Sequence, residues 1–368
     1  MSGNEIIDKK ELNSVVNIFK KSNGVLFAHG FEKRRKNIFR TKIFENNFKN
    51  YLKINHAVSC SSGTAAGVMC LRALGIKEGD EVIVPSFTFI AAVEAIIEVG
   101  AIPIIVDSDI SYNMCPIQAE KKINKKTKCI MLVHMLGVPS NIDKFLKLKK
   151  KYNLKIIEDA CESLGAEYKN KKIGTFGDAS FFSFDFAKII TTGEGGMCVT
   201  DSKRTQKMLQ AIRDHGHENK NGLHRGLDKA IVRGFNFRMS ELQAAVGIEQ
   251  LKKIKKILLL KKKNYTFLEH LFNKNFNQIK IRYNFKFSKQ LYDFLVIQFK
   301  NNKIASKAYS RLNKAGISTG ILPVASRWHY AGYWKHIFKD NQKFKKYNLK
   351  TWKNSWGQIS TSLSLPIS

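Results

Sequence analysis

Short apolar runs alternate with amphipathic segments through the first two thirds of the chain. Apolar runs of strand length fall at residues 57–60, 81–85, 101–107, 128–134, 154–159 and 179–184. Apolar residues at helical spacing predict helices at residues 5–20, 41–52, 65–74, 90–99 and 205–215. Strands that alternate with helices indicate crossover units, so we expect an α/β fold with a mostly parallel sheet sandwiched by helices.

The pattern changes after the sequence G-F-N-F-R-M-S-E-L-Q-A-A, in which Ser240 is suited to cap a long helix. From about residue 262 it predicts short strands, such as 292–299, and then a helix near 304–315. We therefore expect a large domain at residues 1–250 and a smaller α+β domain at residues 251–368.

The charge is strongly basic, with 63 Lys and Arg against 30 Asp and Glu and a net charge of +33. The excess is mostly lysine, spread over the chain and densest at residues 252–263 and 335–350, where we expect solvated surfaces. No recognisable nucleic-acid module accompanies it, so we expect compositional bias and no nucleic-acid partner. The positive field could still attract an anionic substrate.

The compartment is predicted from the cysteines and from the lack of apolar segments. The six cysteines are scattered without a CxxC pair, which indicates reduced and mostly buried thiols. No apolar run approaches the ~20 residues of a membrane span, and the first residues lack the apolar core of a signal peptide. We expect a cytoplasmic protein without membrane insertion.

The carboxyl ends of two predicted strands carry the clearest chemistry. Asp159 ends the strand at 154–159, and Lys188 follows the strand at 179–184, just before the turn T-T-G-E-G-G. Ligands of parallel sheets bind beyond the carboxyl ends of strands. Pyridoxal phosphate needs a carboxylate for its ring nitrogen and an amine for its aldehyde, so this pair predicts such a site.

Both residues also have ordinary interpretations. Asp159 could cap a following helix, and one lysine by itself means little in a chain this rich in lysine. Glu158 should point to the opposite side of the sheet from Asp159, because side chains alternate along a strand.

Residues 61–65, S-S-G-T-A, follow a strand and open a helix. A helix start offers free N–H groups and the positive end of the helix dipole, which suits a phosphate. A plain N-cap by Ser or Thr explains the same residues equally well. Ser183 could likewise give its hydroxyl to a phosphate or hydrogen-bond locally within its strand.

A loop after residue 213 holds three histidines, His215, His217 and His224. A metal site is one interpretation, but no cysteine or dense carboxylate set completes a familiar ligand pattern. We expect no metal.

Five motifs in order give the chain a resemblance to a known family. They are S-S-G-T-A-A, G-D-E-V-I-V-P-S-F-T-F, E-D-A-C-E-S-L-G-A, S-F-D-F-A-K-I-I-T-T-G-E-G-G and G-F-N-F-R-M-S-E-L-Q-A-A. From about residue 35 to the C-terminus the chain resembles the DegT/DnrJ/EryC1/StrS sugar aminotransferases. The resemblance implies the fold-type I aminotransferase architecture and pyridoxal 5'-phosphate as cofactor.

The resemblance also implies roles for individual residues. Lys188 would form the Schiff base, Asp159 would pair with the pyridinium, and Phe89 would stack on the ring. The phosphate would be held by Thr64, Ala65 and Ser183. Asn236 would reach the phosphate of a neighbouring subunit, which implies a homodimer with shared sites.

The chain departs from the family pattern in three places. Glu162 stands where the family often has Gln or His in contact with the ring hydroxyl, and a carboxylate there would repel a phenolate unless it is protonated or paired. Asp185 and Phe186 stand where His and Pro are frequent. The chain stops at S-L-P-I-S, where many relatives continue, so the last element is expected to be missing or differently built.

The substrate implied by the resemblance is a keto sugar, nucleotide-linked or an octulosonate sugar acid, with L-glutamate as amino donor. Some stretches resemble the 8-amino-3,8-dideoxy-manno-octulosonate transaminases, which act in lipopolysaccharide synthesis. Candidate substrate contacts are His215, Arg225, Arg238, Trp328 and His329, and each could equally be a surface or packing residue.

Other functions remain as alternatives. A sugar dehydratase on the same fold is one, although such relatives replace the Schiff-base lysine by histidine. A non-catalytic homologue is another, and the retained Lys188, Asp159 and Ser183 argue against it. A basic nucleic-acid binder would show a salt-dependent affinity for DNA.

Overall fold

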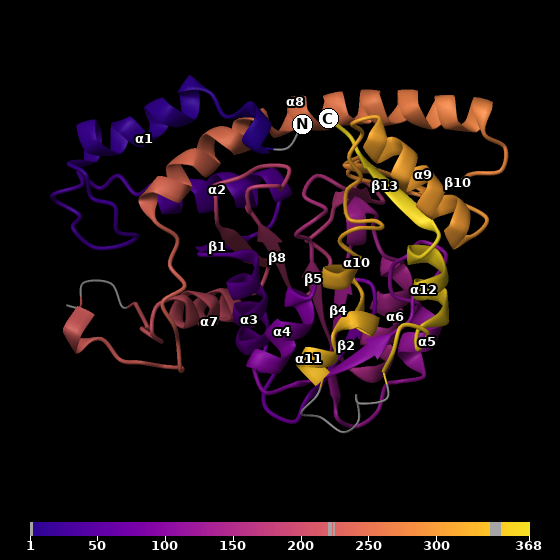
Figure 1. Ribbon diagram of the computed structural model, residues 1–368. Helices are drawn as coiled ribbons and strands as arrows, with labels where there is room; N and C mark the ends of the chain where they lie inside the picture. Colours follow the sequence, from indigo (N-terminus) through magenta and orange to yellow (C-terminus); the bar gives the residue numbers. More distant parts are fainter. Residues whose placement is uncertain (1–2, 220–222, 224, 339–346) are drawn as a thin grey trace. The chain divides into compact units, whose positions relative to one another are not determined.

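A computed structural model describes residues 3–219, 223, 225–338 and 347–368 (Figure 1). The chain divides into two compact units. Unit 1 comprises Met1–Glu78, Lys155–Leu164 and Lys172–Ile257, and unit 2 comprises Gly79–Leu154, Gly165–Lys171 and Leu258–Ser368. The boundary expected at residue 250 stays a prediction.

The strands confirm the predicted α/β class with its mixed, mostly parallel seven-stranded sheet. In unit 1 the strand order is β1-β9-β8-β5. The bounds are β1 (His56–Cys60), β5 (Lys155–Asp159), β8 (Ala179–Ser183) and β9 (Gly196–Thr200). Strand β5 runs parallel to β8, whereas β9 runs antiparallel to both β1 and β8.

Four helices of unit 1 follow the predicted apolar periodicity: α1 (Lys9–Ser22), α2 (Arg40–Leu52), α3 (Gly63–Ala73) and α7 (Lys203–Arg213). The short helix η1 (Gly3–Ile6) precedes α1, and the short helix η3 (Arg225–Leu227) lies at the end of the stretch predicted as a loop. Helix α1 begins later than predicted because Asp8 and Glu11 form a capping box there. Each of the two side chains accepts a backbone N–H that the first helical turn would leave unpaired.

Unit 2 contains the other three strands of the sheet, in the order β4-β2-β3 and all parallel. These are β2 (Glu81–Pro85), β3 (Ile102–Val106) and β4 (Thr127–Val133), with helices α4 (Ala91–Glu98), α5 (Pro116–Glu120), η2 (Met135–Gly137) and α6 (Ile142–Tyr152). Two short strands of this unit are β6 (Glu167–Tyr168) and β11 (Ser288–Lys289), and a third short strand, β7 (Lys171–Lys172), begins at the last residue of this segment of unit 2.

The last part of unit 2 is built on a small antiparallel sheet, in the order β10-β12-β13. Its strands are β10 (Lys280–Ile281), β12 (Phe294–Gln298) and β13 (Ser362–Pro366). The helices are α9 (Asn302–Lys314), α10 (Ser326–His329), η4 (Ala331–Tyr333), α11 (Lys335–Phe338) and α12 (Lys353–Ile359). The strand predicted at 292–299 and the helix predicted near 304–315 are confirmed.

The long helix α8 (Glu241–Asn275) corrects the prediction of strands from residue 262. Ser240 caps it as expected, because its hydroxyl accepts the N–H of Gln243 at 3.3 Å. Tyr265 is 3% exposed, and Leu268 and Phe272 pack against the same cluster at helical spacing. The lysines between these apolar residues obscured the continuing helical pattern.

Lys261 corrects a second expectation, that of a fully solvated lysine surface at residues 252–263. Its side chain is only 4% exposed and its ammonium lies 2.6 Å from the Asp293 carboxylate. It also donates to the carbonyl of Ile367 at 2.5 Å. A buried lysine is tolerated here because its charge and its hydrogen bonds are paired.

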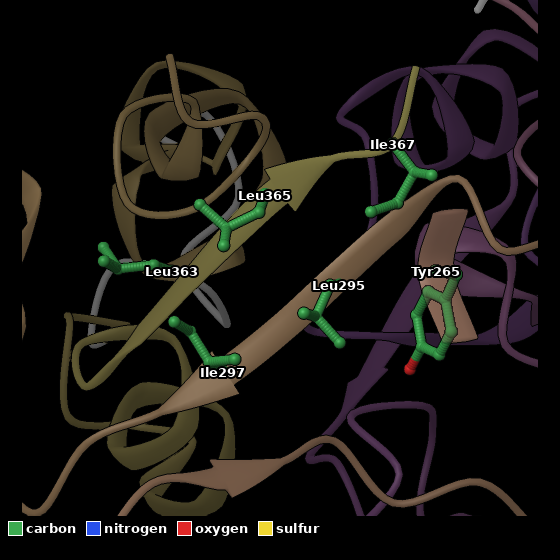
Figure 2. Packing of buried hydrophobic residues seen from close by; sticks show 6 residues of the cluster. All are labelled: Tyr265, Leu295, Ile297, Leu363, Leu365 and Ile367. Atoms are coloured by element: carbon green, nitrogen blue, oxygen red, sulfur yellow. The ribbon is translucent and has the colours of Figure 1, made fainter. Parts of the chain in front are cut away.

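A six-residue apolar cluster forms the core of the small sheet, as Figure 2 shows. The cluster comprises Tyr265, Leu295, Ile297, Leu363, Leu365 and Ile367. Leu295 lies opposite Leu365 and Ile297 lies opposite Leu363 on β12 and β13. These cross-strand pairs bury one face of the sheet, which is the main source of stability for so small a sheet.

Replacing Leu295 with Ala should destabilise unit 2. Leu295 is 0% exposed, so its truncation loses buried apolar surface and leaves a cavity. We expect a loss of about 2 to 5 kcal/mol in the free energy of unfolding, measured in urea. The control is Leu259→Ala, at a side chain that is 70% exposed. Equal effects of the two changes would contradict the assignment of the core.

Within the described residues, no helix combines the length and the apolar character needed to cross a membrane. Four of the six cysteines are buried and two are partly exposed, which confirms the expectation of mostly buried thiols.

Candidate active site

Four strand ends of unit 1 meet along one edge of its sheet. Ser183, at the end of β8, lies opposite Gly196 on β9, which in turn lies opposite Cys60 at the end of β1. Asp159, at the end of β5, lies opposite Phe181. The parallel direction of β5 and β8 therefore places Asp159 and Ser183 at the same edge, as the sequence predicts.

Helix α3 begins against this edge with almost no clearance. A Cβ on Gly63 would lie 2.8 Å from Cβ of Ser183, and a Cβ on Gly196 would lie 2.2 Å from the carbonyl oxygen of Ser62. Only glycine fits these two positions, because real Cβ atoms do not approach that closely. The close approach brings the start of α3 next to Ser183.

The start of α3 has the form of a phosphate cradle. Ser62 is the N-cap residue, and its hydroxyl accepts the N–H of Ala65 at 3.1 Å. Thr64 is exposed, whereas Ala65 is buried. The cap uses one of the first N–H groups, and the dipole and the remaining N–H groups of the first turn still favour an anion. The two interpretations of residues 61–65 are thus compatible.

Asp159 is the buried carboxylate of the site. It is 8% exposed, and its Oδ1 accepts the N–H of Cys161 at 3.1 Å. Burial raises the pKa of Asp159, although the hydrogen bond from Cys161 opposes the shift. No helix begins between residues 160 and 170, so the alternative that Asp159 is a helix cap is wrong.

Glu158 faces away from Asp159, as predicted. Its carboxylate accepts the N–H groups of Phe176 at 2.6 Å and Gly177 at 2.7 Å. Glu158 therefore holds the loop before β8, which leaves Asp159 as the carboxylate at the strand end.

Lys188 lies among acidic groups after β8. Its Nζ is 3.7 Å from Oε1 of Glu162, and the two side chains are 24% and 14% exposed. Burial would lower the pKa of Lys188, but the negative groups around it, Glu162 first, outweigh burial and raise it. The carboxylate at position 162, which departs from the family pattern, is thus paired with an ammonium.

The backbone fixes the turn that carries Lys188. Its N–H donates to the carbonyl of Asp185 at 3.1 Å, and its own carbonyl accepts the N–H of Gly3 at 2.9 Å. Asp185 also accepts the N–H of Ala187 at 3.0 Å. These bonds form a tight turn that does not need the His and Pro frequent in the family.

These residues fit pyridoxal 5'-phosphate. A buried carboxylate, an amine and a helix start without room for side chains lie at one sheet edge of unit 1. They are the three groups that the ring nitrogen, the aldehyde and the phosphate of this cofactor require. Ser183 keeps a local interaction as well, since its hydroxyl accepts the N–H of Asp185 at 3.3 Å.

The buried carboxylate of Asp214, which the sequence did not single out, contacts two arginines and one histidine. It accepts hydrogen bonds from Arg225 at 2.5 Å and 2.6 Å and from Arg238 at 2.5 Å, and it lies 3.3 Å from the ring of His29. Burial alone would raise the pKa of Asp214, but the bonds from His29 and Arg225 lower it well below its usual range. Two predicted substrate contacts, Arg225 and Arg238, thus bind the same carboxylate, that of Asp214.

The remaining predicted residues of unit 1 lie on its surface. His215 is exposed and adopts a left-handed backbone conformation with φ of 53°. Asn236 is exposed and forms a single β-bridge with Asp214. An exposed amide is available to another subunit, which is what the resemblance implies for Asn236.

Phe89 and His329 belong to unit 2, where they lie together. Their ring centroids are 5.2 Å apart, and the N–H of Thr88 donates to the His329 carbonyl at 3.0 Å. Phe89 is 45% exposed and Trp328 is 59% exposed, whereas His329 is buried. The stacking of Phe89 on the cofactor ring and the substrate roles of His329 and Trp328 stay predictions.

Residues 36–368 match the DegT/DnrJ/EryC1/StrS aminotransferase family. The chain belongs to this family. It is 41% identical to the GDP-perosamine synthase of Escherichia coli O157:H7 over 237 residues, which are 64% of this chain and 63% of that relative. The aligned part is thus less than two thirds of that enzyme's length.

Solved structures confirm the fold-type I aminotransferase architecture. The aminotransferase from Psychrobacter cryohalolentis superposes with a TM-score of 0.86 at 26% identity, covering 98% of this chain and 92% of that one. A GDP-4-keto-6-deoxymannose-3-dehydratase superposes with a TM-score of 0.83 at 25% identity, covering 98% of this chain and 94% of that one. The fold therefore serves both aminotransferases and dehydratases, and residues at the site must separate the two.

The metal interpretation of the histidine loop gains no support in this DegT/DnrJ/EryC1/StrS family member. His217 lies 3.4 Å from the Asp228 carboxylate. Among the described residues, no group of three or more His, Cys, Asp or Glu side chains could hold a metal ion, and His224 lies outside those residues.

Replacing Asp214 with Asn should destabilise the protein in a pH-dependent way. At neutral pH we expect a loss of about 3 kcal/mol in the free energy of unfolding, the low end for breaking a buried ion pair, because Arg225 is 37% exposed. The folded pKa lies below the unfolded one, so this stabilisation is present above about pH 4 and lost as the pH falls further.

Urea denaturation of both proteins at several pH values measures this difference. It should be constant from about pH 5 to 8 and should shrink below about pH 4. Asp201→Asn is the control, because Asp201 accepts only an exposed N–H of Asn55 among the hydrogen bonds described for it. A difference that is absent at neutral pH, or that grows in acid, would contradict the anchoring role of Asp214.

Proposed function

We propose that the protein is a pyridoxal-phosphate-dependent aminotransferase that moves an amino group from L-glutamate to the keto group of a nucleotide-linked sugar. The observation that carries the proposal is the Lys188 amine beside Glu162, on the turn that follows β8 in the unit that also holds Asp159 and the cradle at α3. The family match supports the reaction class.

Asp159, Lys188 and the phosphate-binding residues have separate roles in the proposed reaction. When bound, the cofactor supplies a conjugated ring that accepts electrons from the carbon bearing the amino group. Asp159 holds a proton on the ring nitrogen, because a buried carboxylate pairs best with a cation. Lys188 takes and returns the proton at the substrate carbon through its Nζ. The start of α3 and Ser183 hold the phosphate.

The substrate class rests on the relatives. The GDP-perosamine synthase is named for a GDP-linked amino sugar, so a GDP-linked keto sugar is the first substrate to test. Such an amino sugar would serve surface polysaccharide or lipopolysaccharide synthesis in the cytoplasm. An octulosonate sugar acid is the competing substrate, and the relatives reported above give it no support.

A sugar dehydratase is the second candidate, because a dehydratase shares the fold. Lys188 favours transamination, since the resembling dehydratases have histidine there. The product distinguishes the two candidates: amination adds nitrogen to the sugar, whereas dehydration removes an oxygen.

Lys188 should be the residue that binds the cofactor covalently. Incubation with pyridoxal phosphate, reduction with sodium borohydride and peptide mass spectrometry should locate the cofactor on Lys188. Lys188→Ala should lose this label and reduce turnover by at least about 10³-fold while keeping its thermal unfolding midpoint. A label on another lysine, or turnover retained without Lys188, would overturn the proposal.

We also propose a homodimer in which Asn236 serves the site of the partner subunit. The exposure of Asn236 supports this, and mixed dimers test it. Lys188→Ala and Asn236→Ala subunits are each expected to be impaired. Mixed dimers should regain activity, because one of their two sites would have both native residues. No recovery on mixing, with dimers shown by light scattering, would place Asn236 in its own subunit's site or outside any site.

A further inference from the structure

Glu162 forms the ion pair described for the Lys188 ammonium. The distance from Nζ to Oε1 is 3.7 Å, and both side chains are largely buried. Asp159 has its own partner, the N–H of Cys161. Glu162 is therefore the acid placed to compensate the Lys188 ammonium.

We propose that Glu162 is a positioning residue that holds the Lys188 amine as an ammonium ion until the cofactor aldehyde reaches it. The inference deepens the proposed function and rests on it in one respect, that Lys188 is the lysine that meets the cofactor. It follows from the geometry of the pair, and it assigns Glu162 a task that a neutral residue at that position could not perform.

The charges around the amine decide the direction of the effect. Within unit 1, the acidic groups that act on Lys188 are Glu162, Cys161, Asp159 and Asp185, in that order. Burial opposes all four, because a buried ammonium loses hydration. If Glu162 loses its charge, less negative charge opposes the effect of burial. The pKa of Lys188 then falls, and the ammonium is easier to deprotonate.

Before Lys188 can react with the cofactor aldehyde, its ammonium must lose one proton. An N–H bond at Nζ of Lys188 breaks, and an O–H bond forms on Glu162 or on solvent water, without transfer of electrons. The resulting neutral amine is the nucleophile. Glu162 thereby sets the pH range in which the site accepts an aldehyde.

Amine labelling of the cofactor-free protein tests this directly. Acetic anhydride is neutral and reacts only with neutral amines, so the labelling rate of Lys188 against pH gives the midpoint of its titration by peptide mass spectrometry. Glu162→Gln should lower this midpoint and raise the labelling rate below it by about tenfold or more. Glu162→Asp should stay close to the native midpoint because it keeps the charge.

An internal reference lysine and a control variant complete the experiment. Lys169, an exposed lysine 2.6 Å from Asp143, should keep its midpoint in every variant. Asp185→Asn should shift the midpoint of Lys188 less than Glu162→Gln does. An unchanged or raised midpoint in Glu162→Gln, or an equal drop in Glu162→Asp, would overturn the proposal.

The native protein gives a further test should Glu162→Gln fail to fold. Its Lys188 midpoint should lie above the ordinary lysine value of about 10.4, whereas burial without a paired acid would place it below. A midpoint below that ordinary value would refute the pairing. Because no cofactor is present, this result is independent of borohydride mapping, which tests whether Lys188 meets the cofactor at all.

Discussion

The ion pair between the partly buried Lys188 and the Glu162 carboxylate is the interaction on which the rest of the site depends. An amine on a turn after a strand would lose its charge on burial unless acids compensated it. Glu162 lies 3.7 Å away, and Asp159 ends the strand adjacent to β8. The parallel pairing of β5 and β8 is what brings these acids to the turn that carries Lys188.

The backbone sets a second constraint on the same edge. Gly63 and Gly196 leave room only for main chain between α3, Ser62 and Ser183. A side chain at either position would push the helix start away from the strand ends and open the cradle. The proposed phosphate site therefore depends on the absence of side chains at Gly63 and Gly196 as much as on the residues present.

Much of this could be predicted from the sequence because the signals are local. The strands ending at Asp159 and Ser183 are short apolar runs, and the helix start at residues 61–65 has its cap residue in place. The opposite orientations of Glu158 and Asp159 follow from the alternation of side chains along a strand. The ordered motifs added the family and the fold.

The rest could not be predicted, because it depends on contacts between distant segments. Asp214 follows a helix and carries no motif, yet it binds His29, 185 residues earlier, as well as Arg225 and Arg238. Lysines between the apolar residues of α8 obscure its helical periodicity past residue 262. The burial of Lys261 depends on its ion pair with Asp293. Such pairings become visible only once the chain is folded.

The visible absorption spectrum of the protein with pyridoxal phosphate, recorded before and after addition of L-glutamate, tests whether the protein is an aminotransferase. We expect the band of the lysine-bound cofactor to appear first. Glutamate should then replace it by the band of the aminated cofactor, with release of one equivalent of 2-oxoglutarate. The absence of the lysine-bound band would contradict the assignment of an aminotransferase that uses this donor. A band that does not change when glutamate is added, without release of 2-oxoglutarate, would also contradict it.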